Sequence, residues 1–184
     1  MFDREITIRG RFATYMKALC QLPPNASDAD KKAFSNYKIF DTYINAYMIA
    51  PVIGMLNGKK SYLAPTDEDK NNVGMLEGVL IKNASKLKYV YRLIVLTDDS
   101  EGLTDEEKIN RAFREDNNDE SVKKGMELYT AYFFGGLEVL YETFVMNCIT
   151  DDDYIAKMFE FVNEFKEEQS IDDLTLDIEA LLKN

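Results

Sequence analysis

Apolar residues recur at every third or fourth position along most of the chain, and this spacing constrains the fold more than any other feature. Between Arg11 and Pro23, for example, they are Phe12, Tyr15, Met16, Leu19 and Cys20. A period near 3.6 residues places such side chains on one face of a helix, which must pack against other elements. The spacing therefore predicts a mainly α protein.

The other predicted helices cover approximately residues 33–56, 83–96, 104–115, 120–147, 150–165 and 170–182. The stretch from Ala46 to Leu56 is the most apolar and should be the central buried helix. It is either continuous or broken at Pro51, which has no backbone N–H to donate. Asn57-Gly58 should end it, because both residues tolerate the left-handed conformation of a C-cap.

These elements predict an irregular single-domain helical bundle of six to eight helices, with room for a short N-terminal strand or small hairpin at residues 3–9. A chain of 184 residues with 46% hydrophobic residues can bury a real core. We expect residues 1–149 to form the helical core domain. Residues 150–184 should form an acidic pair of helices, packed on that core or appended to it.

The residue inventory argues against most catalytic chemistry. The sequence contains no histidine, the commonest general base and metal ligand. Its two cysteines, Cys20 and Cys148, are too far apart for a CxxC pair or a thiolate zinc cluster, which favours a reducing compartment. Neither a phosphate-binding loop nor a dinucleotide-binding glycine pattern occurs. We therefore expect a non-enzymatic protein without cofactor or metal.

One weaker alternative is a metal-dependent hydrolase that uses Asp98, Asp99 and Glu101. Carboxylates are suitable ligands for hard cations. The stretch resembles a calcium-binding loop in composition only, since the glycine and the terminal glutamate are not at the required positions.

The N-terminus and the hydropathy pattern predict a cytoplasmic protein with no membrane contact. Residues 1–5 read Met-Phe-Asp-Arg-Glu, with charges where a signal peptide needs an apolar core. The longest apolar stretch is about half the length of a membrane span.

The net charge of −11 is unevenly distributed. Residues 1–92 contain 14 Lys or Arg against 9 Asp or Glu, whereas residues 93–184 contain 8 against 24. Such asymmetry is typical of polar recognition, unless the two halves interleave in space. The basic candidates for nucleic-acid or partner contact are Arg4, Arg9, Arg11, Lys17, Lys59 and Lys60. The acidic candidates for a partner surface are Asp151, Asp152, Asp153, Glu164, Glu167 and Glu168.

A glycine pair, Gly135-Gly136, interrupts the longest predicted helix. Two glycines reduce helix propensity by roughly 1–2 kcal/mol, so their presence needs a reason. We expect a packing role, in which the missing Cβ atoms allow close approach of the helix around Ala46–Leu56.

Three segments carry a resemblance to a known family. They are the apolar helix with its Asn-Gly-Lys-Lys end (residues 43–60), the apolar block Leu93–Leu96, and the stretch from Glu127 to Leu140 with its Gly-Gly-Leu-Glu sequence. In this order they resemble a family of small bacterial proteins encoded beside DNA-phosphorothioation (dnd) genes, the dnd system-associated proteins. The resemblance implies a role in bacterial defence or DNA-modification islands and no particular reaction.

Two functions remain open. The first is a non-enzymatic accessory or adaptor protein of a bacterial anti-phage defence or DNA-modification system, which acts by protein–protein contact. The alternative is a DNA-binding or DNA-mimicking regulator of a nucleic-acid enzyme. In either case we expect the partner to be a protein of a defence or DNA-processing complex, and any contact with nucleic acid to be indirect. The chain could also form a homo-oligomer.

Overall fold

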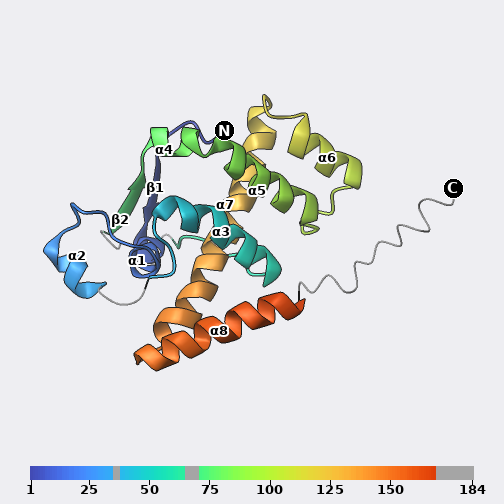
Figure 1. Cartoon of the computed structure of the whole chain (residues 1–184). Helices are drawn as coiled ribbons and strands as arrows, with labels where there is room; N and C mark the ends of the chain where they lie inside the picture. Colours follow the sequence, from blue (N-terminus) through green and yellow to red (C-terminus); the bar gives the residue numbers. More distant parts are fainter. Residues whose placement is uncertain (35–37, 65–70, 169–184) are drawn as a thin grey trace.

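The computed structural model describes residues 1–34, 38–64 and 71–168, and it confirms a mainly α fold (Figure 1). Strands β1 (Ile6–Arg9) and β2 (Asn72–Met75) form a small antiparallel sheet, with Ile6 opposite Met75. The helical elements are α1 (Gly10–Leu19), α2 (Asp28–Ala33), α3 (Tyr43–Leu56), α4 (Glu77–Lys82), α5 (Ala84–Thr97), α6 (Asp105–Phe113), α7 (Asp119–Tyr141), the π-helical turn η1 (Glu142–Met146) and α8 (Asp151–Glu168).

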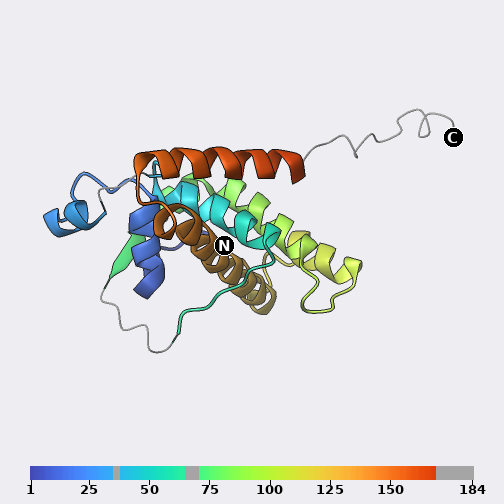
Figure 2. The same ribbon diagram turned by 90° about the horizontal axis from the view of Figure 1, so that it is seen from below.

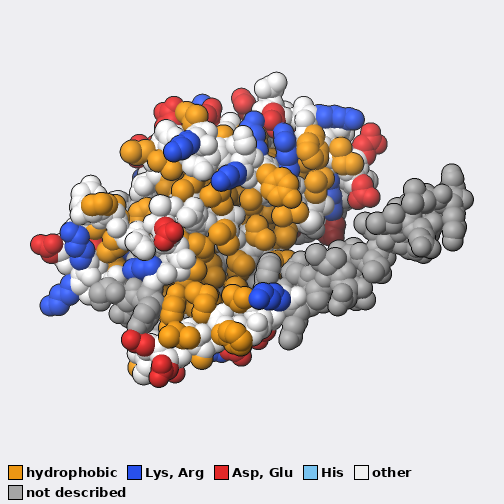
Figure 3. All heavy atoms as spheres, in the orientation of Figure 1, with side chains coloured by type: hydrophobic (Ala, Val, Ile, Leu, Met, Phe, Trp, Pro, Cys, Tyr) orange, Lys and Arg blue, Asp and Glu red, His pale blue; other side chains and the backbone are white. Residues whose placement is uncertain are grey.

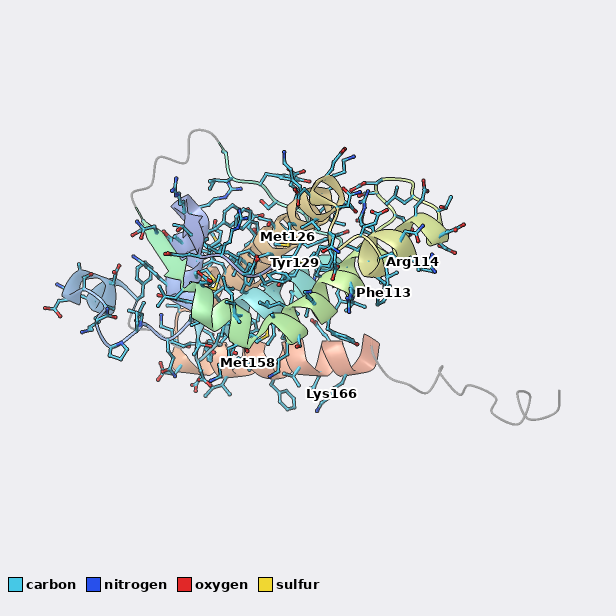
Figure 4. All side chains as sticks on the ribbon, turned by 90° about the horizontal axis from the view of Figure 1, so that it is seen from above. Phe113, Arg114, Met126, Tyr129, Met158 and Lys166 are labelled. Carbon is cyan, nitrogen blue, oxygen red and sulfur yellow. The ribbon has the colours of Figure 1, made fainter. Side chains whose placement is uncertain are left out.

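The centre of the molecule is the pair of helices α3 and α7, which share the most extensive contact of any two elements. Figure 1 shows α7 passing behind α3, with α1 and the sheet on one side and α5 and α6 on the other. The interface is aromatic, because the ring of Tyr47 on α3 lies edge-on to the rings of Tyr129 and Phe133 on α7. Tyr129 is fully buried among the side chains that fill the interior (Figure 4).

Three glycines allow α3, the segment after it and α7 to approach with their backbones nearly in contact. A Cβ atom added to Gly136 would lie 1.8 Å from the carbonyl oxygen of Ala50, and one added to Gly54 would lie 2.1 Å from that of Tyr132. At Gly135 the close neighbour is the segment that follows α3, since an added Cβ would lie 1.8 Å from the Lys59 carbonyl oxygen. Both glycines of the pair therefore pack closely, Gly136 against α3 and Gly135 against the segment that follows α3.

Helix α3 is continuous through Pro51, which lies inside it. Proline has no N–H, so the carbonyl of Tyr47, four residues earlier, loses its usual helical donor. The hydroxyl of Tyr129 donates a hydrogen bond of 2.6 Å to this carbonyl oxygen. A side chain of α7 therefore completes the hydrogen bonding of α3.

The predicted helix over residues 33–56 begins too early, because residues 38–42 are not helical and α3 begins only at Tyr43. The preceding helix α2 begins before any helix predicted for this part of the chain, and the Ser27 hydroxyl caps its N-terminus by accepting from the Asp30 amide. Residues 38–40 instead follow the end of α1: the Ile39 amide donates to the Leu19 carbonyl, and the Lys38 ammonium donates to the carbonyls of Lys17 and Ala18. These tertiary hydrogen bonds hold the segment out of a helix.

Two further boundaries differ from the prediction. Residues 120–147 do not form one α-helix, because α7 ends at Tyr141 and the chain continues as the π-helical turn η1. No helix or strand was predicted between residues 57 and 82, yet Asn72–Met75 form β2, which pairs with β1. The short helix α4, after β2, has no counterpart in the prediction.

Helix α8 lies across one side of the α3–α7 pair (Figure 2). It packs chiefly on η1, where the ring of Phe144 contacts those of Tyr154 and Phe161. The helix predicted for residues 170–182 lies outside the described residues.

Candidate protein-interaction surface

Two of the basic candidates, Arg11 of α1 and Lys59 after α3, pair with the same acid, Glu138 of α7. The Arg11 guanidinium is 3.1 Å from the Glu138 carboxylate, and the Lys59 ammonium is 3.6 Å from its other oxygen. Lys59 also pairs with Glu142 at 3.1 Å, and the Ser61 hydroxyl donates to Glu138 at 2.8 Å. The charges of both cations are thus balanced within the molecule.

Lys60 belongs to a second and more buried network. Its ammonium lies 2.7 Å from the carboxylate of Asp98, which is 4% exposed and also accepts from the Tyr132 hydroxyl at 2.6 Å and the Ser100 hydroxyl at 2.6 Å. Burial by itself raises the pKa of Asp98, but the hydrogen bonds from Lys60, Ser100 and Tyr132 outweigh it and lower the pKa to about 2. The pKa of Tyr132 is raised, first by burial and then by its hydrogen bond to Asp98. The charge of Lys60 is thus balanced by a carboxylate of the same chain.

The remaining basic candidates do not join these clusters. Lys17 pairs with Asp30 at 3.0 Å and donates to the Asn71 side chain at 3.1 Å. Arg4 and Arg9 are exposed, before and at the end of β1. The six predicted cations therefore do not form one continuous basic surface, and four of them neutralise acids of the same chain.

The three carboxylates of the hydrolase alternative each pair with a different cation. Asp98 pairs with Lys60, Asp99 pairs with Lys108, and Glu101 lies 2.9 Å from Arg111. Over residues 1–34, 38–64 and 71–168, no group of three or more acidic or cysteine side chains is placed to hold a metal ion. Cys20 is fully buried, and burial raises the pKa of its thiol to about 12, so it is not a reactive thiolate.

The acidic candidates all belong to helix α8, three at its start and three towards its end. Asp151, Asp152 and Asp153 are exposed in its first turn, where negative charge interacts favourably with the helix dipole. Asp153 also caps the helix, because its carboxylate accepts from the Thr150 amide at 2.9 Å. Glu164 is exposed further along α8, and the side chains of Glu167 and Glu168 lie outside the described ones.

The most prominent unpartnered feature is apolar. Along α3 the outward positions are Ile49, Val52 and Leu56, and Ile49 is 46% exposed. Helix α5 packs beside α3, with the Thr97 hydroxyl against the Met55 sulfur, and its outward positions are Tyr89, Leu93 and Leu96. We call these six residues the α3/α5 surface. Figure 3 shows hydrophobic side chains gathered in a band across this face.

A groove of about 350 Å³ continues the α3/α5 surface towards α8. One wall is formed by Asn45, Ile49 and Ile53 of α3. The opposite wall is formed by Met158 and Phe161 of α8, and Figure 4 places Met158 near the middle of that helix. Phe159, on the next position of α8, is 71% exposed. The apolar character therefore extends over three helices.

Two exposed cations stand near the junction of α4 and α5. Lys82 and Lys86 are both exposed, and neither forms an ion pair with any residue that the structure describes. Lys82 is the last residue of α4, whereas Lys86 lies in the first turn of α5, three and seven positions before Tyr89 and Leu93 and on the same side of that helix. Sequence reasoning missed these two residues and the α3/α5 surface. The helical spacing of Lys86, Tyr89 and Leu93 was the available signal.

Comparisons with protein-family models, curated protein sequences and solved structures found no match. Among the described helices, none is both long and apolar enough to cross a lipid bilayer. Its own geometry therefore has to carry the interpretation: a mainly α protein in which four of the six predicted cations pair with acids of the same chain, with an exposed apolar face on α3 and α5.

Proposed function

We propose that this protein is a non-enzymatic accessory or adaptor protein that binds a partner protein through the α3/α5 surface. The observation that supports the proposal is the contiguous apolar area over α3, α5 and the groove beside α8. Exposed apolar patches of this kind are typical of protein contacts. An apolar groove between helices is the usual acceptor for the apolar face of an amphipathic helix.

The charges around the surface favour an acidic partner helix. Lys82 and Lys86, near the junction of α4 and α5, are exposed and form no ion pair with a described residue, so they can pair with carboxylates of a bound helix. We therefore propose an amphipathic helix with apolar residues at i, i+3, i+4 and i+7, and with acidic residues beside them.

The setting proposed for this contact is a cytoplasmic defence or DNA-modification complex in bacteria. The resemblance to the dnd system-associated proteins is the reason for this choice. Direct DNA contact loses support as an alternative, because Arg11, Lys17 and Lys59 already pair with acids of the same chain.

The test compares proteins captured from the native host by three tagged forms of the chain. Leu93→Glu with Val52→Glu should keep the helical circular-dichroism spectrum but lose the partner. The matched control, Ile149→Glu, changes a side chain that is 94% exposed outside the α3/α5 surface, and it should retain the partner. The partner is then purified, and its affinity for the double variant should be at least tenfold weaker, about 1.4 kcal/mol. Equal binding by all three forms would overturn the proposal.

A further inference from the structure

Helix α8 has two apolar stripes, and only one of them packs on the rest of the molecule. The inner stripe contacts η1 or lines the groove beside α3, and it consists of Tyr154, Met158 and Phe161. The outer stripe consists of Ile155, Phe159 and Val162, which are 64%, 71% and 41% exposed. Its steps of four and three positions are those of the contact line between two paired helices. The outer stripe therefore has the pattern of a helix-pairing surface.

The position of α8 leaves room for a second helix. Figure 2 shows α8 as the outermost layer on one side of the fold. Figure 3 shows acidic side chains at the start of α8 and hydrophobic ones along it, on the face turned to the viewer. A helix of another molecule can therefore reach the outer stripe without moving any described element.

The two ends of the outer stripe carry opposite charges. Asp152 stands three positions before Ile155, and Lys166 stands four positions after Val162. These steps continue the spacing of the outer stripe, so both charges lie along the same line of the helix. Both side chains are exposed, and neither forms an ion pair with a residue that the structure describes. Figure 4 places Lys166 near the end of α8.

This arrangement of charges is complementary to a second copy of itself. Asp152 and Lys166 lie seven positions on either side of Phe159, about 10 Å along the helix at 1.5 Å per residue. When two α8 helices run antiparallel about a twofold axis at Phe159, Asp152 of each copy lies beside Lys166 of the other. A parallel pair would instead place the acidic first turns side by side, where they repel each other. The charges therefore favour one orientation of two identical helices.

We propose that the chain forms a homodimer in which two α8 helices pack antiparallel through their outer stripes, with an Asp152–Lys166 ion pair at each end. The outer stripe shares no residue with the α3/α5 surface, so this inference does not rest on the proposed function. One helix from each copy buries less than the about 1,600 Å² of a standard interface. The dimer is therefore expected to be reversible, with a dissociation constant in the micromolar range.

Sedimentation equilibrium of the full chain, over a range of concentrations at low salt, measures the dissociation constant of the dimer. Phe159→Glu places two carboxylates against each other at the twofold axis, so the dissociation constant should rise at least about tenfold. The matched control is Phe113→Glu, which changes a half-exposed phenylalanine on α6 and should dimerise as wild type does. Thermal melting followed by circular dichroism shows that both variants are folded.

A charge swap tests the orientation of the two helices. Asp152→Lys alone places two lysines together at each end, so dimerisation should weaken at least about threefold. Glu164→Lys makes the same change in net charge on the opposite side of α8 and should have no such effect. Adding Lys166→Asp to Asp152→Lys recreates both ion pairs in reversed order, and the dissociation constant should return to within about twofold of wild type.

Three outcomes would overturn the proposal. The first is a wild-type chain that stays monomeric at about 500 µM, well above a micromolar dissociation constant. The second is a dimer that Phe159→Glu leaves intact, because the outer stripe would then not form the contact. The third is a double charge swap that dimerises no more tightly than Asp152→Lys, because the helices would then not be antiparallel.

Discussion

At the scale of single residues, the Tyr129 hydroxyl of α7 donates a hydrogen bond that the backbone of α3 lacks at the Tyr47 carbonyl. Pro51 leaves the Tyr47 carbonyl without a helical donor, and the Tyr129 hydroxyl takes that place at 2.6 Å. Tyr129→Phe leaves this carbonyl buried and unsatisfied, so the free energy of unfolding in urea should fall by about 1–3 kcal/mol.

The double-mutant cycle with Pro51→Ala supplies the control. Alanine restores a backbone N–H at position 51, which can donate to the Tyr47 carbonyl. Tyr129→Phe should therefore cost clearly less in the Pro51→Ala background, with a coupling free energy of at least about 0.5 kcal/mol. Two additive substitutions would contradict this account of the proline.

The network around Asp98 predicts a dependence of stability on pH. The Asp98 pKa is about 2 in the folded protein against 3.8 for an ordinary aspartate. Because folding lowers this pKa, the ionised Asp98 carboxylate stabilises the fold in full at pH values above the pKa of the unfolded state. This contribution to stability disappears as the pH falls from about 4 to about 2. The size of the shift corresponds to about 2 kcal/mol.

Asp98→Asn should accordingly be less stable than wild type at pH 6, and the difference should shrink as the pH approaches 2. Denaturant titrations at several pH values measure it. Asp28→Asn is the matched control, because the Asp28 side chain is fully exposed on α2 and should change stability little at any pH. A gap for Asp98→Asn that stays constant with pH would show that the carboxylate charge is unimportant.

At the scale of helices, the packing of α3 on α7 depends on the missing Cβ atoms. Gly136→Ala gains about 1 kcal/mol of helix propensity but places a methyl group 1.8 Å from the Ala50 carbonyl oxygen. Because backbone must move to relieve this contact, we expect a net loss of about 1–3 kcal/mol and a lower melting temperature.

Gly78→Ala distinguishes propensity from packing. Gly78 is also helical, in α4, but an added Cβ there has no neighbour within 4 Å. The melting temperature should rise with a gain of up to about 1 kcal/mol. If both alanine variants shift the melting temperature in the same direction, close approach is not the reason for the glycine pair.

Local signals predicted some elements well and others not at all. The capping box Thr104–Glu107 starts α6 where the sequence places it, because a capping box depends only on residues within one turn. In contrast, β2 is held by pairing with β1, more than 60 positions earlier in the chain, and the Asn72-Val73-Gly74-Met75 sequence has little strand propensity of its own. Residues 38–42 fall within the predicted helical periodicity, but hydrogen bonds from residues 38–40 to α1 override it.

The candidate site was harder to predict for a related reason. A lysine in the sequence does not reveal whether an acid from another helix will face it: Arg11 meets Glu138 from 127 positions away, while Lys82 meets no acid of the described chain. Likewise, apolar periodicity does not tell a helix face that is covered from one that is left open, as on α3 and α5.

At the scale of the whole molecule, hydrogen exchange should report a gradient of local stability. The α3–α7 pair contains many of the fully buried side chains, whereas α2 has no buried residue. Amide protons of α3 and α7 should therefore exchange slowest, at rates near those of global unfolding, and those of α2 fastest. Mass spectrometry of exchanged peptides measures the order, and equal protection of α2 and α7 would contradict it.

The hydrogen bond between Tyr129 and Tyr47 also has a consequence for folding kinetics. Helix α3 cannot complete its own backbone hydrogen bonding, since the missing donor belongs to a residue 82 positions later. Formation of α3 and docking of α7 are therefore coupled steps, and the chain must close a loop of this length before its central pair is complete. The rate-limiting step of folding is then expected to involve a long-range contact rather than the formation of any one helix.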